Sequence, residues 1–400
     1  MRRRQTFLYI LLTVFVVGLV GGLSYWHFQN NDQTRQAKKL QKKSAKESAS
    51  KASSQSSSTP AAKRSSSQQP KKLTGQALRI TNYLRQNHFV GSALIVRNGR
   101  VIYRRGLGYA NYAKRQPNLP NSQYQILSIQ KSLTAVQMMK LVVEKRLSLN
   151  TKLAKFYPAI PNANRITIRN LLDMDSGLSM STVGANVALS EKRVIEYAVT
   201  HVDSRETALG QWDYQPVNYV LLAGIIGKLT KQSYRQNFYQ TFVYPLNLRG
   251  TGFVQRWPAS SFRTIAYRYQ KTNQAEQNYE VPFKEAQAAK QNELGTGQVY
   301  MSPIDLFKAE RAILRGRIIS RQAVAALHAA GSASTYGGGI YNLKNGIRSH
   351  GIGYGYEAVI LITRGGQNGV VLLSNNYRPA QSIQEPAIAL YTELLDGQIT

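Results

Sequence analysis

The chain has 400 residues and a formal net charge of +32, from 52 Lys and Arg against 20 Asp and Glu. It contains no cysteine, which excludes disulfide scaffolds, thiolate metal sites and cysteine nucleophiles. The five histidines are scattered, none at zinc-ligand spacing and none in an HExxH motif, so we expect neither a metal nor another cofactor. The positive charge favours a polyanionic partner: nucleic acid, anionic lipid or an anionic cell-wall polymer.

The first residues predict a membrane anchor. Three arginines at positions 2–4 precede an apolar stretch at 6–26 that is long enough to cross a bilayer. Arginines on this side favour a cytoplasmic terminus at 1–5 and a single-pass protein whose remainder is extracellular. With the domain outside the cell, we do not expect nucleic acid to be its polyanionic partner. A cleaved signal peptide is the alternative, but no small-x-small cleavage site follows the apolar stretch.

Residues 27–72 predict a disordered stalk. They are rich in Gln, Ser, Lys and Ala, with almost nothing apolar to form a core. The basic side chains could contact anionic lipid heads, or they could only keep the tether extended and soluble. We therefore expect the globular domain, a monomer, at 73–400.

Helical spacing of apolar residues marks 73–89 as the first helix of this domain. A strand at 91–96 and a return strand at 101–103 flank Asn98-Gly99, a strong hairpin turn signal. A longer helix is predicted from about Ser128 to Lys145, with an apolar side that includes Leu133 and Val136.

The second half returns to strands. The stretch from 150 to about 288 contains short helices and loops, after which strands are predicted at 356–362 and 370–374 and a closing helix at 382–395. Strands at both ends with helices between them predict an α/β fold of the α+β type. Its antiparallel sheet is formed by the two chain ends and flanked by helices, with an inserted all-helical lobe.

The strongest chemical signal is Ser128-Ile129-Gln130-Lys131 at the start of the long helix. Residues three apart share a helix face, so the hydroxyl and the amine can meet. A serine needs a neighbouring base to act as a nucleophile, and a desolvated lysine can supply one. The exposed N–H groups of a helix N-terminus would favour negative charge developing on a substrate.

The segments around this motif resemble the serine β-lactamase and penicillin-binding protein superfamily. The similarity is greatest to the class C β-lactamase-like esterases and D-amino-acid peptidases, and it runs from about residue 75 to 400 in the family's order. The matching segments include GSALIVRNGRVIYRRGLGYAN, QYQILSIQKSLTAVQMMKLVVEKRLSLNTKL, RITIRNLLDMDSGLS, DYQPVNYVLLAGIIGKLTKQSY, FVYPLNLRGTGF, GTGQVYMSPIDLFK and HGIGYGYEAVILI. A β-lactamase/transpeptidase-like fold is what this resemblance implies.

The resemblance also implies roles for individual residues. Ser128 corresponds to the acylated serine and Lys131 to its partner base. Tyr214 falls at the tyrosine of the family's Tyr-x-Asn motif, which shuttles protons between the serine, the leaving group and water.

The family's third motif has Lys or His at its first position, any residue at its second and Gly at its third. It aligns with Ser349-His350-Gly351. In that alignment the backbone N–H groups of Ser128 and Ile352 form the oxyanion hole.

Two departures from the family pattern bear on the substrate. Pro216 stands where the Tyr-x-Asn motif has its asparagine, so the amide that grips a peptide or β-lactam side chain is missing. Ser349 stands where the third motif has its cation, and His350 and Asn218 are the candidates to replace that contact with the substrate. Both departures argue against D,D-carboxypeptidase and β-lactamase activity more than against an esterase.

We therefore expect an acyl-serine hydrolase that cleaves D-alanyl esters on teichoic acid, as D-alanyl esterases of this superfamily do. One alternative is a D,D-carboxypeptidase acting on peptidoglycan stem peptides and acylated by penicillin. Another, of a different class, is a catalytically silent wall-binding protein that keeps the fold.

Overall fold

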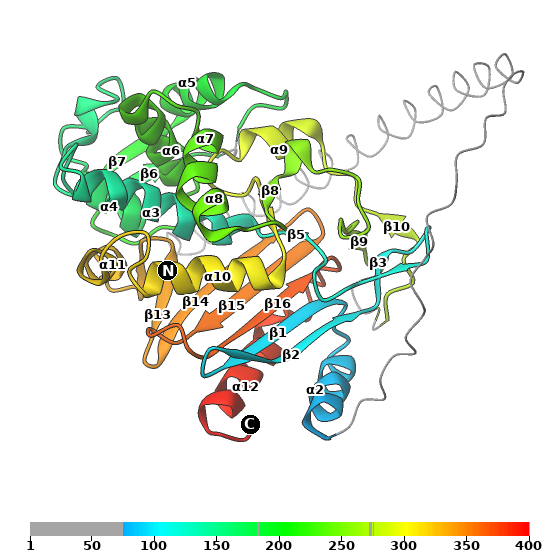
Figure 1. The fold of residues 1–400 in the computed structure, drawn as a ribbon. Coiled ribbons are helices and arrows are strands. Elements are labelled where there is room, and N and C mark those ends of the chain that lie inside the picture. The colour runs from blue at the N-terminus through cyan, green and yellow to red at the C-terminus, as the bar shows by residue number, and fades with distance from the viewer. Residues whose placement is uncertain (1–74, 182–183, 272–273, 275, 400) are drawn as a thin grey trace, which may run out of the picture. The chain divides into compact units, whose positions relative to one another are not determined.

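The computed structural model describes residues 75–181, 184–271, 274 and 276–399 (Figure 1). The anticipated cytoplasmic terminus at 1–5, membrane anchor at 6–26 and stalk at 27–72 lie outside these residues. Within the described ranges, no helix is both long and apolar enough to cross a bilayer.

The centre of the domain is a seven-stranded antiparallel sheet that both chain ends build. Its first strand along the chain, β1, pairs with its last, β16, with Gly91 opposite Ser374. This pairing confirms the expected α+β architecture. In spatial order the strands are β12 (Tyr336–Gly337), β13 (Ile340–Leu343), β14 (Gly346–Gly353), β15 (Tyr356–Ile362), β16 (Gly369–Ser374), β1 (Gly91–Arg97) and β2 (Arg100–Leu107).

The turn between β1 and β2 has the conformation that its sequence predicts. Asn98 has a φ of 51 and Gly99 a φ of 78, both in the left-handed region. A two-residue hairpin turn of this type needs positive φ at both positions, and asparagine and glycine adopt it most easily.

Both faces of the sheet are covered, since β15 and β16 are buried at every position. In β16, Val370 and Leu372 belong to the core under α2 (Gly75–Gln86) and α12 (Gln384–Leu395). Val371 and Leu373 face the opposite core, against which α10 (Pro303–Leu314) packs (Figure 1). Successive side chains of a strand point to opposite faces, so each strand contributes to two cores.

The inserted lobe is not all-helical, which corrects the sequence-based expectation. It contains the antiparallel strand pair of β6 (Ser176–Ser179) and β7 (Asp203–Leu209) beside its helices. Most of β7 is polar and exposed, so its sequence lacks the apolar alternation that would have indicated a strand.

The remaining helices are α3 (Gln130–Val143), α4 (Ile168–Asp173), α5 (Glu191–His201), α6 (Val217–Thr230), α7 (Tyr234–Phe238), α8 (Tyr244–Leu246), α9 (Gln287–Asn292) and α11 (Arg321–His328). Single turns of 3-10 or π helix lie at η1 (Leu127–Ile129), η2 (Leu153–Lys155), η3 (Tyr239–Val243) and η4 (Val254–Arg256). The short strands are β3 (Tyr109–Asn111), β4 (Gln116–Pro117), β5 (Tyr124–Gln125), β8 (Gly252–Phe253), β9 (Tyr267–Arg268), β10 (Val281–Pro282) and β11 (Val299–Met301).

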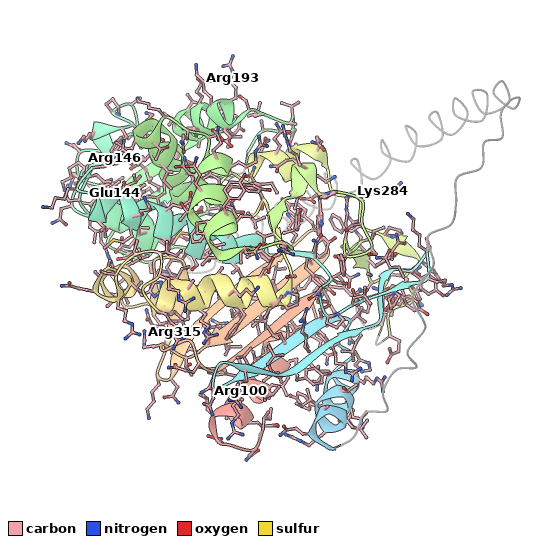
Figure 2. The ribbon with its side chains drawn as sticks, in the orientation of Figure 1. Arg100, Glu144, Arg146, Arg193, Lys284 and Arg315 are labelled. Carbon is pink, nitrogen blue, oxygen red and sulfur yellow. The ribbon has the colours of Figure 1, made fainter. Side chains whose placement is uncertain are left out.

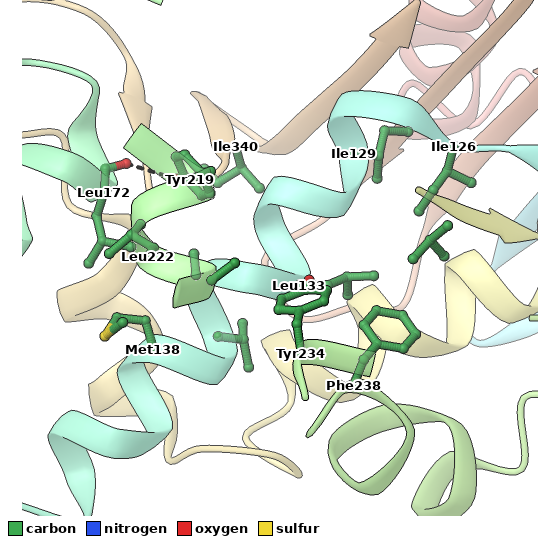
Figure 3. Close-up of a cluster of buried hydrophobic side chains, with 14 of the residues drawn as sticks. Ile126, Ile129, Leu133, Met138, Leu172, Tyr219, Leu222, Tyr234, Phe238 and Ile340 are labelled. Carbon is green, nitrogen blue, oxygen red and sulfur yellow. Dashed lines mark hydrogen bonds between the residues drawn. The ribbon is translucent and has the colours of Figure 1, made fainter. Parts of the chain in front are cut away.

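Helix α3 runs through the core between the lobe and the sheet. Figure 3 shows Leu133 of α3 beside Tyr234, and Met138 near Leu222 of α6. Tyr219 of α6 is fully buried and donates its hydroxyl to Leu172 O at 2.9 Å, so its polar atom is satisfied within this core (Figure 3). A helix packed on all sides is a rigid support for the residues at its N-terminal end.

Candidate active site

Ser128 lies in the single turn η1, directly before α3. The preceding residue, Leu127, has a φ of 51, a left-handed conformation that costs a bulky residue roughly 1–3 kcal/mol. The helix itself begins at Gln130, two residues later than its sequence predicts. Strain of this kind is typical of functional sites, where the surrounding structure holds one side chain in a fixed direction.

Lys131 lies one turn further along and contacts the serine. Its Nζ donates to Ser128 Oγ at 2.9 Å and to the backbone oxygen of Thr296 at 3.5 Å. The side chain is only 2% exposed. No carboxylate of the described residues lies within ion-pair distance of this amine. The arrangement therefore places a desolvated amine directly beside a hydroxyl, as a serine–lysine dyad requires.

A carboxylic acid lies near this dyad without pairing with the lysine. Burial raises the pKa of the Glu293 carboxyl, while a hydrogen bond from the Tyr354 hydroxyl and the charge of Lys131 act to lower it. The Glu293 carboxyl thus accepts a hydrogen bond from Tyr354 and forms no ion pair with Lys131.

Tyr214 reaches the same site from the segment before α6. Its ring centroid lies 5.1 Å from Lys131 Nζ, and it packs edge-on against Tyr336 with centroids 5.9 Å apart. Tyr214 and Ser128 line one cavity. The structure thus brings together the three side chains for which the sequence predicts catalytic roles.

That cavity has a volume of about 390 Å³, within the range of small-molecule sites. Its walls come from η1, the segment before α6, β12–β14 and the start of α12. The lining residues are Ser128, Tyr214, Tyr336, Gly339, Tyr341, Arg348, His350, Ile352 and Gln384.

Strand β14 passes very close to the serine, and Gly351 permits this approach. A Cβ atom at Gly351 would lie 2.4 Å from Ile126 O and 2.9 Å from Ser128 N. The next residue, Ile352, lines the cavity. The backbones of Ser128 and Ile352 therefore border the same space, as an oxyanion hole formed by their N–H groups would require.

His350 lines the cavity and is held in place from behind. Its Nε2 lies 2.9 Å from Oε1 of Glu357, a residue with no exposed surface. Glu357 also accepts hydrogen bonds from the Ser382 hydroxyl and from the backbone N–H of Ile383. This buried carboxylate fixes the imidazole ring at the wall of the cavity.

Two residues expected to bind substrate do not reach the cavity. Asn218 is 1% exposed; its Oδ1 accepts from the Ser176 hydroxyl and its Nδ2 donates to Gln215 O. Ser349 is also buried and donates its hydroxyl to Gly339 O at 3.4 Å. Asn218 lies in the first turn of α6 and faces the lobe core, so it does not replace the missing contact with the substrate.

The sequence-based prediction missed Arg348, which brings a cation to the cavity. Its guanidinium lies 4.8 Å from the ring centroid of Tyr341 and donates a hydrogen bond to the Gln384 side chain. Residues two apart in a strand share a face, so the period of β14 places Arg348 beside His350. Applied to His350, which the sequence already singles out, this rule would have found the arginine.

Titratable side chains at the site do not form a metal-binding arrangement. In the part of the chain that the structure describes, no group of three or more His, Asp or Glu side chains could hold a metal ion. The chemistry available is that of a nucleophile, an amine, a phenol, an imidazole and a guanidinium around one cavity.

Similarity to known proteins agrees with this geometry. A Bacillus subtilis (strain 168) protein named as a penicillin-binding protein, PbpX, is 28% identical over 310 residues, which cover 77% of this chain and 76% of PbpX. The teichoic acid D-alanine hydrolase of Staphylococcus aureus is 26% identical over 242 residues, which cover 60% of this chain and 58% of that protein. The second match thus spans less than two thirds of the relative's own length.

Solved structures share the fold. FmtA from Staphylococcus aureus superposes with a TM-score of 0.70 at 23% identity, covering 80% of this chain and 88% of FmtA. D-amino acid amidase from Ochrobactrum anthropi SV3 has a TM-score of 0.67 at 17% identity, covering 80% of this chain and 100% of the amidase. The model of the Beta-lactamase family matches residues 77–392, which is most of the described domain. The chain therefore belongs to the Beta-lactamase family of serine hydrolases and penicillin-binding proteins.

Proposed function

We propose that this protein hydrolyses D-alanyl esters of teichoic acid through an acyl-enzyme on Ser128. The observation that carries the proposal is the 2.9 Å contact between Lys131 Nζ and Ser128 Oγ at a cavity shared with Tyr214. A nucleophile and its base in hydrogen-bond contact are the minimum that acyl transfer requires.

The reaction needs only this chain's own groups and water. Ser128 Oγ attacks the ester carbonyl and its proton passes to Lys131. The backbone N–H groups of Ser128 and Ile352 stabilise the resulting oxyanion. When the intermediate collapses, Tyr214 relays a proton to the departing alcohol oxygen of the polymer. Water then attacks the acyl carbon, which releases free D-alanine and restores the Ser128 hydroxyl.

The composition of the cavity supports an ester more than a peptide. Pro216 offers no amide at the position where relatives hold a peptide or β-lactam side chain, and Asn218 is committed to Ser176 and Gln215. Ester hydrolysis does not require that amide contact, because the alcohol of an ester is already a good leaving group. Arg348 supplies a cation at the cavity for a phosphate of the polymer.

The relatives and the charge support the substrate class. One relative is named a teichoic acid D-alanine hydrolase, although it is only 26% identical. A formal charge of +32 suits a polyanionic substrate. The proposal includes an anchored topology, with residues 6–26 in the cell membrane and the catalytic domain, a monomer, outside the cell. This part rests on the N-terminal sequence pattern alone.

A second candidate function is D,D-carboxypeptidase activity on peptidoglycan stem peptides. It is favoured by the 28% identity to PbpX, which is named as a penicillin-binding protein. A wall-binding protein without catalysis is the third candidate, and its basis is the altered second and third motifs.

A substrate comparison separates these functions. The full chain would be incubated with D-alanylated lipoteichoic acid and, separately, with a peptide ending in D-Ala-D-Ala, and free D-alanine would be followed. We expect release from the ester and little from the peptide. Release from the peptide alone, together with stable labelling of Ser128 by penicillin, would establish the carboxypeptidase instead. No release from either substrate, with the fold intact, would favour the silent binding protein.

A further inference from the structure

A second cavity, about 690 Å³ in volume, lies outside the catalytic site. It is formed by the C-terminal end of α10, by α11, by the segment that leads into β12, and by the turn between β15 and β16. Two arginines, Arg321 and Arg364, line it together with His328, Thr335 and Asn342. We call this cavity the α11 groove.

The positive charge of the α11 groove is not balanced. Arg364 donates to two neutral oxygens, Asn342 Oδ1 and Leu343 O, at 3.2 and 3.3 Å. No carboxylate of residues 75–399, outside the undescribed gaps, lies within ion-pair distance of Arg321 or Arg364. The nearby carboxylate of Asp173 has no exposed surface and already pairs with Arg169.

More arginines extend this positive surface along α10. Burial lowers the pKa of the Arg311 guanidinium, and the charges of Arg315 and Arg317 lower it further, so these three cations lie close together. Figure 2 shows Arg315 at the end of α10. Leu314, the last residue of this helix, lines the groove, so Arg315 directly follows a groove residue in the chain.

The α11 groove and the catalytic cavity share one thin wall. In β13, Tyr341 lines the catalytic cavity and the next residue, Asn342, lines the groove. The same alternation occurs where Thr335 lines the groove and Tyr336 the catalytic cavity. The two residues facing the groove are joined by a hydrogen bond from Asn342 N to Thr335 O at 2.9 Å. Consecutive residues of an extended chain point to opposite faces, so a ligand in the groove lies one strand away from the site of catalysis.

We propose that the α11 groove binds the phosphodiester backbone of the polymer whose ester groups Ser128 cleaves. Arginine matches phosphate oxygens with paired N–H donors, and Thr335 and Asn342 add neutral hydrogen-bonding groups. The apolar side chains of Leu314 and Val324 offer a surface for the aliphatic carbons of a polyol. Binding here would hold neighbouring repeats of the chain close to the catalytic cavity and raise their local concentration.

This inference rests on the proposed function for the identity of the ligand, but its test does not require catalysis. The full chain would be titrated with unacylated poly(glycerol phosphate), which has phosphodiesters and no ester to cleave. The groove variant is Arg321→Gln with Arg364→Gln. A matched control, Arg193→Gln with Arg205→Gln, removes the same charge from exposed positions on α5 and β7 of the lobe.

We expect the groove variant to bind poly(glycerol phosphate) about 10-fold more weakly, because two exposed arginine–phosphate contacts are lost, while the control pair binds like the wild type. Because Arg364 also bonds β13, Arg321→Gln is tested alone as well, and Arg321→Lys should recover part of the affinity. Equal affinities of the groove variant and the control pair would overturn the proposal.

Two further ligands test the commitment to a polyol phosphate chain. Short-chain phosphatidylglycerol presents the same phosphodiester as a lipid head, and a single-stranded oligonucleotide presents it with bases. The groove variant and the control pair should bind each of these two ligands with equal affinity. An equal loss for all three ligands would overturn the proposal in favour of general attraction to anions. If the wild type released no D-alanine but the groove variant still lost polymer affinity, the proposed function would fail and the groove assignment would stand.

Discussion

Lys131 is the residue on which the chemistry depends most, after the nucleophile itself. It is buried, and its Nζ has only two hydrogen-bond partners among the described residues, Ser128 Oγ and Thr296 O. Of these two partners only the Ser128 hydroxyl can give up a proton, so Lys131 is placed to act as the base for Ser128.

We predict that Lys131→Met lowers kcat on a D-alanyl ester by about 1,000-fold, the usual contribution of a positioned base. Methionine is flexible and apolar, so it should fill the buried space with little change in Tm. The matched control is Lys140→Met on the same helix, an exposed lysine that pairs with Glu144. Steady-state kinetics and thermal unfolding of both variants are the measurements. A Lys131→Met enzyme with more than about a tenth of wild-type kcat would contradict the assignment of this base.

The sequence predicted part of this geometry and could not predict the rest. The spacing of Ser128 and Lys131 indicated that their side chains meet, because positions three apart share a helix face. The inward direction of Asn218 was not predictable, since a polar residue at a helix start can face either core or solvent. Its orientation is set by Ser176, a partner 42 residues away in the sequence.

At the scale of elements, the approach of β14 to η1 shapes the site. Gly351 is the point of closest approach, and the added Cβ would collide with backbone atoms of Ile126 and Ser128, which cannot move independently. Gly353, two residues further along β14, is different: its added Cβ would meet only side-chain atoms of Leu127, the nearest at 3.0 Å.

We predict that Gly351→Ala lowers kcat at least about 10-fold, because β14 must move away from Ser128 and misplace the oxyanion donors. Gly353→Ala should retain most of the activity, since a flexible leucine side chain can shift. Kinetics on a D-alanyl ester would be compared for the two variants, with circular dichroism to verify folding. Equal effects of the two substitutions would show that the approach of β14 at Gly351 is not what positions the site.

Other elements show where sequence patterns suffice and where they do not. The β1–β2 hairpin follows from Asn98-Gly99, and β15 follows, at its predicted bounds, from the apolar run at 358–362. The antiparallel pair of β6 and β7 has no such pattern, because its register depends on pairing partners such as Leu178 and Ser204 that are far apart in the sequence. The strained turn at Leu127 is likewise imposed by tertiary structure, since leucine alone does not favour positive φ.

At the scale of the whole molecule, buried acids make stability depend on pH. Glu310 of α10 has no exposed surface, and neither carboxylate oxygen has a hydrogen-bond partner in the described structure. Burial raises the pKa of this carboxyl from 4.5 to about 7, with the Ser132 hydroxyl opposing the shift. The folded state therefore prefers the protonated acid, and the stability from this group is lost as pH rises from about 4.5 through about 7.

We predict that Glu310→Gln removes this loss. Between pH 5 and pH 8 the free energy of unfolding of the wild type should fall by about 3 kcal/mol more than that of the variant, which corresponds to the shift in pKa. Glu144→Gln, at the exposed C-cap position directly after α3, controls for the change in net charge (Figure 2). Denaturant unfolding at the two pH values is the measurement. Parallel pH dependence of the wild type and Glu310→Gln would contradict an ionisable, unpaired Glu310.

The whole molecule combines a serine–lysine site with a strongly positive charge, and both features matter for a polyanionic ester. Arg348 places a cation at the catalytic cavity, and the α11 groove places two more across the wall that β13 forms. Binding a small, neutral ester would require neither Arg348 nor the two arginines of the α11 groove. This pairing of chemistry and charge is why we favour the polymer over a stem peptide.

The central claim is that Ser128 releases D-alanine from teichoic acid. The most direct test follows free D-alanine from D-alanylated lipoteichoic acid, with the full chain and with Ser128→Ala at equal concentrations. The account predicts steady release by the wild type and release at the background rate by the variant. Equal release by the two proteins, or none by a folded wild type, would contradict it.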